Sequence, residues 1–170
     1  MKKHNFSWLS PKIKAGKNKK GRALFAESDI VKGERLIAFG GYIITTQQYL
    51  ALPKNMLDIP IQVDDDLLFG AVKYSELEDV DYLNHSCSPN CGFVGQLMIV
   101  AIKNIKKSEE ITIDYSMCLT DHIRMKCLCE SPDCRKVITG NDWKNLKLQI
   151  KYKKYFQPYI KEKIRKLRKK

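Results

Sequence analysis

Three cysteines toward the end of the chain have a spacing that suits metal binding. Cys127, Cys129 and Cys134 form the pattern C-x-C-x4-C, and thiolates are good ligands for zinc. Three thiolates leave a tetrahedral zinc ion one ligand short. The candidates for a fourth ligand are the other cysteines and two histidines: Cys87, Cys91, Cys118, His85 and His122. Taken alone, the spacing is explained equally well by buried, unpaired cysteines.

Two further segments carry side chains that suit a reaction site. Residues 84–90 read NHSCSPN, and residues 109–115 read EEITIDY. Short polar side chains and a proline are ordinary turn material, so the composition of the first segment predicts a loop. The second segment is strand-like and ends on Tyr115, which composition alone would place in the core at a strand end.

Four segments, in order, resemble motifs of the SET-domain protein-lysine methyltransferases. Residues 20–26 read KGRALFA, which resembles the KGRGLFA-type first motif of that family. NHSCSPN resembles NHSCxPN, and EEITIDY resembles EELTxDY. Residues 127–134 read CLCESPDC, which resembles the post-SET pattern C-x-C-x4-C. One match could arise by chance, but four together, spanning about two thirds of the chain, indicate a compact SET plus post-SET protein.

The resemblance implies a mainly β fold with some α-helix. In this family, small twisted sheets surround a C-terminal pseudoknot in which one segment threads under a loop, and such threading is rare in proteins. A zinc-binding post-SET segment and a C-terminal helix would follow. The expected divisions are a basic N-terminal segment, the SET domain, the post-SET zinc segment and a basic amphipathic helical tail: residues 1–19, 20–117, 118–140 and 141–170.

The resemblance also implies a site for S-adenosylmethionine and one for zinc. The NHSC segment and the segment before Tyr115 would lie side by side and form the cofactor site. Carried over by motif, the cofactor-binding residues are Lys20, Gly21, Arg22, Ala23, Asn84, His85, Tyr115 and Leu128. Zinc would be held by Cys87, Cys127, Cys129 and Cys134, with Cys91 and Cys118 left as packed thiols. The walls of the lysine channel would include Tyr82, Phe93 and Ile113.

Methyl transfer to lysine explains why a tyrosine should end EEITIDY. Transfer from a sulfonium is an in-line displacement, so the enzyme must align the amine nitrogen, the methyl carbon and the sulfur. A free lysine, with a pKa near 10.4, is protonated at neutral pH and lacks a lone pair for attack. Burial and the nearby sulfonium charge both lower the pKa of the amine. The hydroxyl of Tyr115 can then orient the amine, so Tyr115 is the predicted catalytic residue.

Three positions depart from the family pattern. Ala23 replaces a glycine whose missing Cβ allows close backbone approach, but alanine is the smallest alternative, so we expect cofactor binding to survive. Phe39 replaces the tyrosine of an E-Y-x-G-E segment, and the lost hydroxyl could be replaced only by Tyr42. Ile113 takes a position that is often aromatic. No extra hydroxyl then crowds the amine, which predicts di- or trimethylation.

Short strands separated by turn residues must position these groups. The strand-like stretches predict a mainly β domain: residues 23–26, 35–39, 42–45, 59–63, 67–70, 91–94, 97–102 and 110–115. Gly95 and Gln96 join two of them, and glycine first in a two-residue loop predicts a type II′ hairpin. Near the end, Pro158 would break a helix or begin its second half. Helical spacing there predicts an amphipathic helix that docks its apolar residues on the body: Tyr152, Tyr155, Phe156, Tyr159, Ile160, Ile164 and Leu167.

Charge is unevenly divided along the 170 residues, whose net charge is +12. Residues 1–22 carry +8 and residues 144–170 carry +11, so the residues between them carry −7. An acidic body suits a cationic substrate, and basic ends suit a solvated helix face or contact with nucleic acid. The expected substrate is therefore a basic protein, such as a histone-like, DNA-associated or ribosomal protein.

No segment has the composition of a signal peptide or a membrane span. We therefore expect no membrane partner and a place in the cytoplasm or nucleoid, or in a host nucleus after export. The alternative function is a zinc-stabilised basic module that has lost catalysis and binds nucleic acid or a protein. Intact Asn84, His85 and Tyr115 favour the enzyme.

Overall fold

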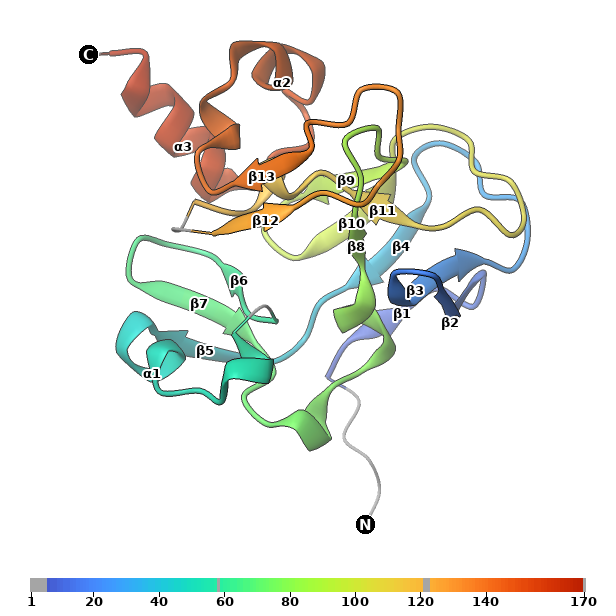
Figure 1. Ribbon diagram of the computed structural model, residues 1–170, viewed down its shortest axis with the longest axis horizontal. Coiled ribbons are helices and arrows are strands. Elements are labelled where there is room, and N and C mark those ends of the chain that lie inside the picture. The colour runs from blue at the N-terminus through green and yellow to red at the C-terminus, as the bar shows by residue number, and fades with distance from the viewer. Residues whose placement is uncertain (1–5, 58, 121–122, 170) are drawn as a thin grey trace.

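The computed structural model describes residues 6–57, 59–120 and 123–169, and within these ranges short strands form five small sheets (Figure 1). The largest has the strand order β1 (Trp8–Leu9), β4 (Arg35–Ala38), β10 (Met98–Ala101) and β9 (Cys91–Val94). A second has the order β5 (Tyr42–Thr45), β7 (Leu67–Gly70) and β6 (Ile61–Gln62). The pairs are β2 (Ile13–Asn18) with β3 (Gly21–Ala26), β8 (Asn84–His85) with β11 (Thr112–Ile113), and β12 (Arg124–Lys126) with β13 (Val137–Thr139). The predicted mainly β architecture is confirmed.

Helices are short. The α-helices are α1 (Thr46–Leu50), α2 (Leu146–Lys151) and α3 (Pro158–Leu167), and the 3₁₀ turns are η1 (Lys54–Met56), η2 (Tyr74–Glu76), η3 (Asp79–Tyr82), η4 (Tyr115–Met117) and η5 (Asp142–Lys144). Pro158 begins α3, because its fixed φ and missing N–H suit a first turn. α1 is absent from the sequence-based prediction, although Thr45 and Gln48 form a capping box that the sequence T-x-x-Q contains. In the described ranges, no helix has the length and apolar character that crossing a membrane requires.

Two strand features differ from the prediction. The β9–β10 hairpin is present, but Val94 pairs with Met98, so the loop holds three residues rather than two, beginning with Gly95 at φ +68. β2 is missing from the prediction because its lysines and glycine hide any apolar alternation. It forms because it pairs with β3 along all of its 6 residues.

The segment before Tyr115 lies between two parts of the chain that are distant in sequence. β11 pairs in parallel with β8, and the Ser86 N–H donates to the Ile113 carbonyl over 2.8 Å. The Ile111 N–H donates to the Leu24 carbonyl of β3, also over 2.8 Å. NHSCSPN and EEITIDY therefore lie side by side, in the arrangement that the expected pseudoknot requires.

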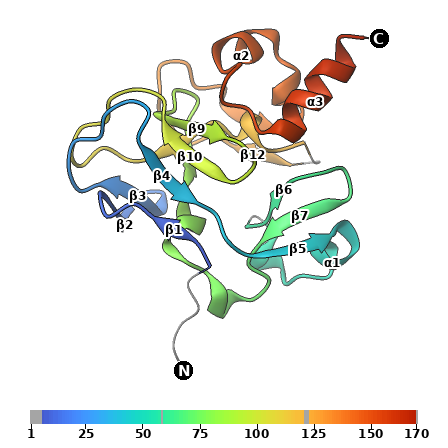
Figure 2. The ribbon, with the colours of Figure 1, turned by 180° about the vertical axis from the view of Figure 1, so that it is seen from behind.

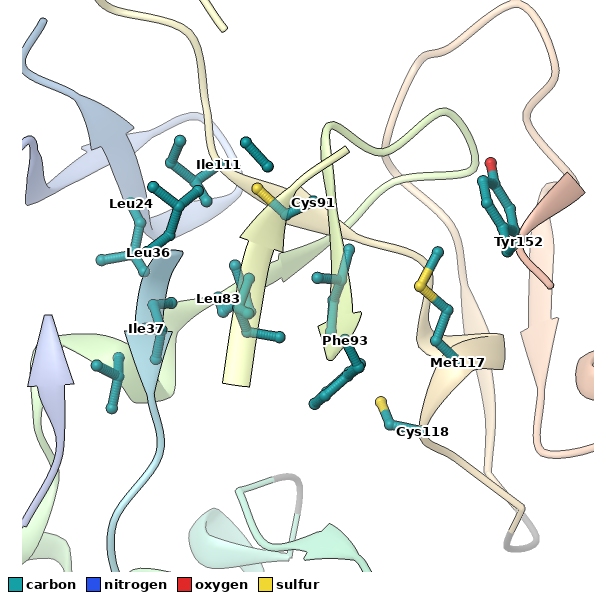
Figure 3. Packing of buried hydrophobic residues seen from close by; sticks show 14 of the residues in the cluster. Leu24, Leu36, Ile37, Leu83, Cys91, Phe93, Ile111, Met117, Cys118 and Tyr152 are labelled. Carbon is teal, nitrogen blue, oxygen red and sulfur yellow. The ribbon is translucent and has the colours of Figure 1, made fainter. Parts of the chain in front are cut away.

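One hydrophobic core joins the sheets to the C-terminal segment. Its fully buried members include Leu24, Leu36, Ile37, Phe93, Ile111 and Met117 (Figure 3). Burial of each such side chain contributes roughly 1.5–3 kcal/mol to the free energy of unfolding. Tyr152, Phe156 and Ile160 are buried in the same core, so most of the predicted apolar stripe docks on the body. The predicted single helix is wrong, because Tyr152, Tyr155 and Phe156 lie in the turn between α2 and α3, and Leu167 is 43% exposed. Gly92 of β9 permits this approach, because a Cβ there would lie 2.7 Å from the Cβ of Tyr155. α2 and α3 consequently lie together at one end of the molecule (Figures 1 and 2).

Candidate active site and metal cluster

Tyr115 is the first residue of η4 and closely follows β11. Its hydroxyl donates to the Leu83 carbonyl over 3.2 Å, and its backbone N–H donates to Nδ1 of His85 over 3.1 Å. Asp114 accepts a hydrogen bond from the Ser116 N–H over 3.0 Å, which caps the turn. These bonds hold the tyrosine ring at the edge of two cavities.

The first, which we call the channel cavity, has a volume of about 260 Å³. Its uncharged walls are Phe39, Leu57, Ile59, Pro60, Ile61, Val80, Leu83, Ile113, Tyr115, Cys118, Leu119, Ile123 and Met125. Among its described lining residues, only Asp81 carries a charge. Burial raises the pKa of Asp81 to about 6, although a hydrogen bond from the Glu78 N–H opposes the rise. An apolar channel with one acidic group suits a side chain that has an aliphatic stem and a cationic head.

Of the three predicted channel residues, the structure brings Ile113 to this cavity. Phe93 is fully buried in the core and stacks on Phe39 at a centroid distance of 6.5 Å, so Phe39 faces the cavity in its place. Tyr42 is 41% exposed and lies outside the cavity walls. It therefore does not replace the hydroxyl that is missing at Phe39.

The second cavity, which we call the cofactor cavity, has a volume of about 170 Å³ and shares Tyr115 and Met125 with the channel cavity. Its other walls are Lys20, Asn84, His85, Lys126, Cys127, Leu128, Cys129 and Ile138. A neighbouring hollow of about 240 Å³ also has Lys20, Cys127 and Leu128 in its walls. Leu128 is 52% exposed and presents an apolar surface to both spaces. Tyr115 thus borders the channel on one side and this cavity on another.

The structure places one residue of the first motif in the wall of the cofactor cavity. Lys20 lines the cavity, but Gly21, Arg22 and Ala23 are not among its walls. Ala23 is fully buried within β3. The guanidinium of Arg22 lies 3.8 Å from the ring centroid of Tyr82 and donates to its hydroxyl. The third predicted channel residue, Tyr82, therefore packs against Arg22 and stays outside the channel walls.

Glu110 is a positioning residue that the sequence analysis does not single out. Its carboxylate accepts hydrogen bonds from Nδ2 of Asn84 over 2.9 Å and from Nζ of Lys20 over 3.0 Å. Asn84 also donates to the Arg22 carbonyl over 3.0 Å. Two walls of the cofactor cavity are therefore tied to one acid of EEITIDY. Glu110 is part of the EEITIDY motif, but its partners Lys20 and Asn84 can be identified only in the folded chain.

The predicted zinc ligands gather beside the cofactor cavity. The ligand atoms of His85, Cys87, Cys127 and Cys129 all lie within 4.8 Å of one another, and the sulfur atoms of Cys87 and Cys127 are 3.8 Å apart. Tetrahedral zinc with Zn–S bonds of about 2.3 Å requires sulfur atoms about 3.8 Å apart. Burial opposes ionisation of Cys129, but hydrogen bonds from Cys87 and Ser131 lower its pKa, whereas burial raises the pKa of Cys87 and Cys127. These donors fit a zinc ion.

Cys134 is not one of these four, but its side chain packs against the same cluster, beside Cys87 and Cys127. Its sulfur accepts a hydrogen bond from the Lys136 N–H over 3.4 Å and lies 4.0 Å from the Cys127 carbonyl. His85, one of the alternatives left open by the spacing, is the fourth member of the group. Its Nδ1 accepts from the Tyr115 N–H, so a neutral ring carries its proton on Nε2 and donates to Cys87 instead of offering that nitrogen to a metal. The remaining candidates are two core thiols, as expected, and a histidine outside the described residues: Cys91, Cys118 and His122.

His85 connects the cluster to the tyrosine. Nδ1 accepts the hydrogen bond from Tyr115, while Nε2 lies 3.3 Å from the sulfur of Cys87. Burial lowers the pKa of His85 to about 4, so the ring is neutral at pH 7 and Nδ1 can accept. Because both nitrogens have partners, the ring has no unused nitrogen for the cofactor cavity.

A buried ion-pair network joins the cluster to the active-site turn. The guanidinium of Arg135 donates to both oxygens of Asp114 over 2.7 and 2.8 Å, and to Asp142 over 2.9 Å. The Asp114 side chain is 0% exposed. The Arg135 N–H also donates to the sulfur of Cys87 over 3.3 Å. No motif reveals this link, because Arg135 and Asp114 meet only after folding, yet it helps to position Tyr115.

Replacing Arg135 with glutamine is expected to lower the free energy of unfolding by about 3–5 kcal/mol, because Asp114 would remain as an uncompensated buried charge. Denaturant unfolding followed by circular dichroism measures the loss. Arg124→Gln is the matched control, since Arg124 is exposed and has no ion pair in the described part of the chain. Its expected change is within about 0.5 kcal/mol. Equal stability of the two variants would contradict the prediction.

The family model described as "SET domain" matches residues 21–116. These are more than half of the chain, so the chain belongs to the SET-domain family. Its fold resembles the structure titled "crystal structure of KRYPTONITE in complex with mCHG DNA and SAH", with a TM-score of 0.57 and 21% identity. That match covers 76% of this chain and 29% of the other. At this identity, the likeness concerns the fold alone.

Curated relatives of the chain are histone-lysine N-methyltransferases. The enzyme set1 of Dictyostelium discoideum is 36% identical over an 84-residue alignment that covers 45% of this chain and 6% of that protein. The enzyme trr of Drosophila melanogaster is 29% identical over a 150-residue alignment that covers 79% of this chain and 6% of that protein. The chain thus spans a small part of the length of these relatives.

Proposed function

We propose that this chain transfers methyl groups from S-adenosylmethionine to the ε-amine of a lysine in a basic protein. The observation that carries the proposal is the place of Tyr115 at the border of the channel cavity and the cofactor cavity. In-line displacement requires the acceptor amine and the methyl donor to meet at one aligned point. The names of the relatives support lysine as the acceptor.

The residues of the cofactor cavity fit S-adenosylmethionine. When bound, the cofactor supplies an electrophilic methyl group on a sulfonium. Lys20 and Asn84 offer polar groups suited to its amino-acid end, and the exposed surface of Leu128 suits its adenine ring. Glu110 keeps Lys20 and Asn84 in place.

The channel cavity fits the substrate lysine. Its apolar walls, which include Phe39 and Ile113, take up the aliphatic stem and lower the pKa of the amine by excluding water. The oxygen of Tyr115 can accept a hydrogen bond from the amine, because a tyrosine hydroxyl both donates and accepts. Neither Phe39 nor Ile113 places a hydroxyl beside the amine, so the expected product is di- or trimethyllysine.

Labelled S-adenosylmethionine tests the proposal directly. The purified chain is incubated with histones, ribosomal proteins and DNA-associated basic proteins, and with the same proteins after acetylation of their lysines. Label is expected on the unmodified proteins only, because an acetylated amine lacks a reactive lone pair. Mass spectrometry then counts the methyl groups on each lysine. Labelling that survives acetylation, or no labelling of any basic protein, would overturn the proposal.

Asparagine in place of Asp81 is expected to stabilise the protein at neutral pH. The folded-state pKa of about 6 lies above the ordinary value of 3.8, so the fold disfavours the ionised carboxylate. This cost is absent below pH 4 and complete above pH 6. The variant should therefore gain about 1–2 kcal/mol at pH 7.5 and almost nothing near pH 4. Thermal unfolding at the two pH values measures the difference.

The same Asp81→Asn variant is expected to raise KM for a basic peptide by about tenfold, because the channel cavity loses its one negative charge. Asp66→Asn is the matched control, since Asp66 is exposed and lies outside the channel walls. It should change neither KM nor the pH dependence of stability. An unchanged KM in Asp81→Asn would limit Asp81 to a structural role.

A further inference from the structure

A groove between α2 and α3 lies apart from the two cavities at Tyr115. It has a volume of about 390 Å³, and its floor includes Phe156 and Ile164. Its exposed wall is mainly apolar, because the other lining residues contribute chiefly their aliphatic stems. None of them is acidic among those described: Gln149, Lys153, Lys161, Arg165, Arg168 and Lys169. We call this the basic groove. It occupies the end of the molecule where α2 and α3 lie together (Figures 1 and 2).

Most of the positive charge around the basic groove is not paired with an acid among the described residues. Arg165 pairs with Glu162, and Arg168 donates to the side-chain amide of Gln149. In the described part of the chain, Lys153, Lys161 and Lys169 form no ion pair. The charge of Lys169 does act on Glu162, and Nζ of Lys161 donates to the Lys154 carbonyl over 3.0 Å. Residues 144–170 contain twelve lysines and arginines and one acid. This excess charge attracts a polyanion and repels a basic protein tail.

The shape of the groove indicates which polyanion fits. Lys161, Arg165 and Arg168 follow helical spacing, so they lie along one face of α3. The one aromatic residue among the described lining, Phe156, is 1% exposed and cannot stack on a nucleotide base. Proteins that hold single strands rely on exposed aromatic rings for stacking. A row of cations without such rings instead suits the phosphates of a duplex.

We propose that the basic groove binds the phosphate backbone of duplex nucleic acid without sequence preference. The surface is separate from Tyr115, so the proposal does not depend on methyl transfer. If both hold, the groove keeps the enzyme on the polyanion that a basic substrate protein also binds.

A short fluorescent DNA duplex of random sequence tests the proposal by anisotropy between about 50 and 200 mM salt. Binding is expected to weaken with salt, with a slope of about −0.9 per phosphate contact in a plot of log K against log salt. The triple variant Lys153→Gln, Lys161→Gln and Lys169→Gln should flatten the slope by about 2–3 and weaken binding at least tenfold at low salt.

A second triple variant removes the same charge elsewhere: Lys32→Gln, Lys54→Gln and Lys103→Gln, all exposed lysines outside the groove. This variant should keep most of the slope of log K against log salt that the wild-type chain shows. Equal losses in the two variants, or no salt-dependent binding by the wild-type chain, would overturn the proposal. Circular dichroism melting shows that each variant is folded.

Polyglutamate of matched charge serves as a competitor. It should displace the duplex poorly, and preferential capture of polyglutamate would assign the groove to an acidic protein segment instead. Tyr115→Phe should bind the duplex as the wild-type chain does. Failure of DNA binding and failure of methyl transfer are therefore observed independently.

Discussion

Phenylalanine in place of Tyr115 is expected to lower kcat for methyl transfer by about 10²-fold or more, while cofactor affinity stays nearly unchanged. The substitution removes the hydroxyl that donates to the Leu83 carbonyl, from a residue that lines both cavities. The ring remains, together with its packing against His85 at a centroid distance of 5.2 Å. Single-turnover transfer of label and calorimetric titration with the cofactor measure the two effects separately.

Tyr42→Phe is the matched control for this prediction. Tyr42 also loses a hydroxyl, but it is 41% exposed and lines neither cavity. Its kcat should equal that of the wild-type chain. If Tyr115→Phe retained full kcat, the hydroxyl would have no part in aligning the amine. If it lost cofactor binding instead, Tyr115 would serve chiefly as a wall of the cofactor cavity.

Zinc removal is expected to weaken cofactor binding at least tenfold, although no zinc ligand needs to touch the cofactor. Cys127 and Cys129 belong both to the cysteine cluster and to the wall of the cofactor cavity, and Leu128 lies between them. His85 carries the connection further, because it touches Cys87 and accepts from the Tyr115 N–H. Loss of the metal would therefore loosen one wall of the cavity and the support of the tyrosine.

Cys127→Ala and chelation should both reduce the metal content from about one zinc per chain and lower cofactor affinity together. Cys91→Ala is the control, because Cys91 is a fully buried core thiol outside the cluster. Elemental analysis and calorimetry give the two readings. Unchanged cofactor affinity after zinc loss would refute the coupling. Cys134→Ser separates the two ligand sets, since zinc is retained if His85 is the fourth ligand and lost if Cys134 is.

Much of the site is predictable because its motifs are local. NHSCSPN places Asn84 and His85 next to Cys87 in any fold, and EEITIDY places Glu110 before Tyr115. The family resemblance then brings the two segments together, and the parallel pairing of β8 with β11 confirms it. Pro158 and the hairpin glycine likewise act through their own backbone angles, so the start of α3 and the β9–β10 turn could be located in advance.

Only the tertiary structure decided which side chains face each cavity. Phe39 lines the channel in place of Phe93, because β4 and β9 are separated by β10 in one sheet and Phe93 is buried behind Phe39. Arg22 turns to Tyr82 instead of the cofactor cavity. Such directions depend on long-range packing, which residue spacing does not encode.

The sequence by itself therefore determined the family and located the candidate tyrosine and cysteines, since these are properties of short motifs. The tertiary structure decided how the motifs are coupled. Arg135 reaches back to Asp114 and Cys87, and His85 joins the cysteines to Tyr115. Only the folded chain brings these distant groups within hydrogen-bond distance and buries them, and burial gives their pairing its strength.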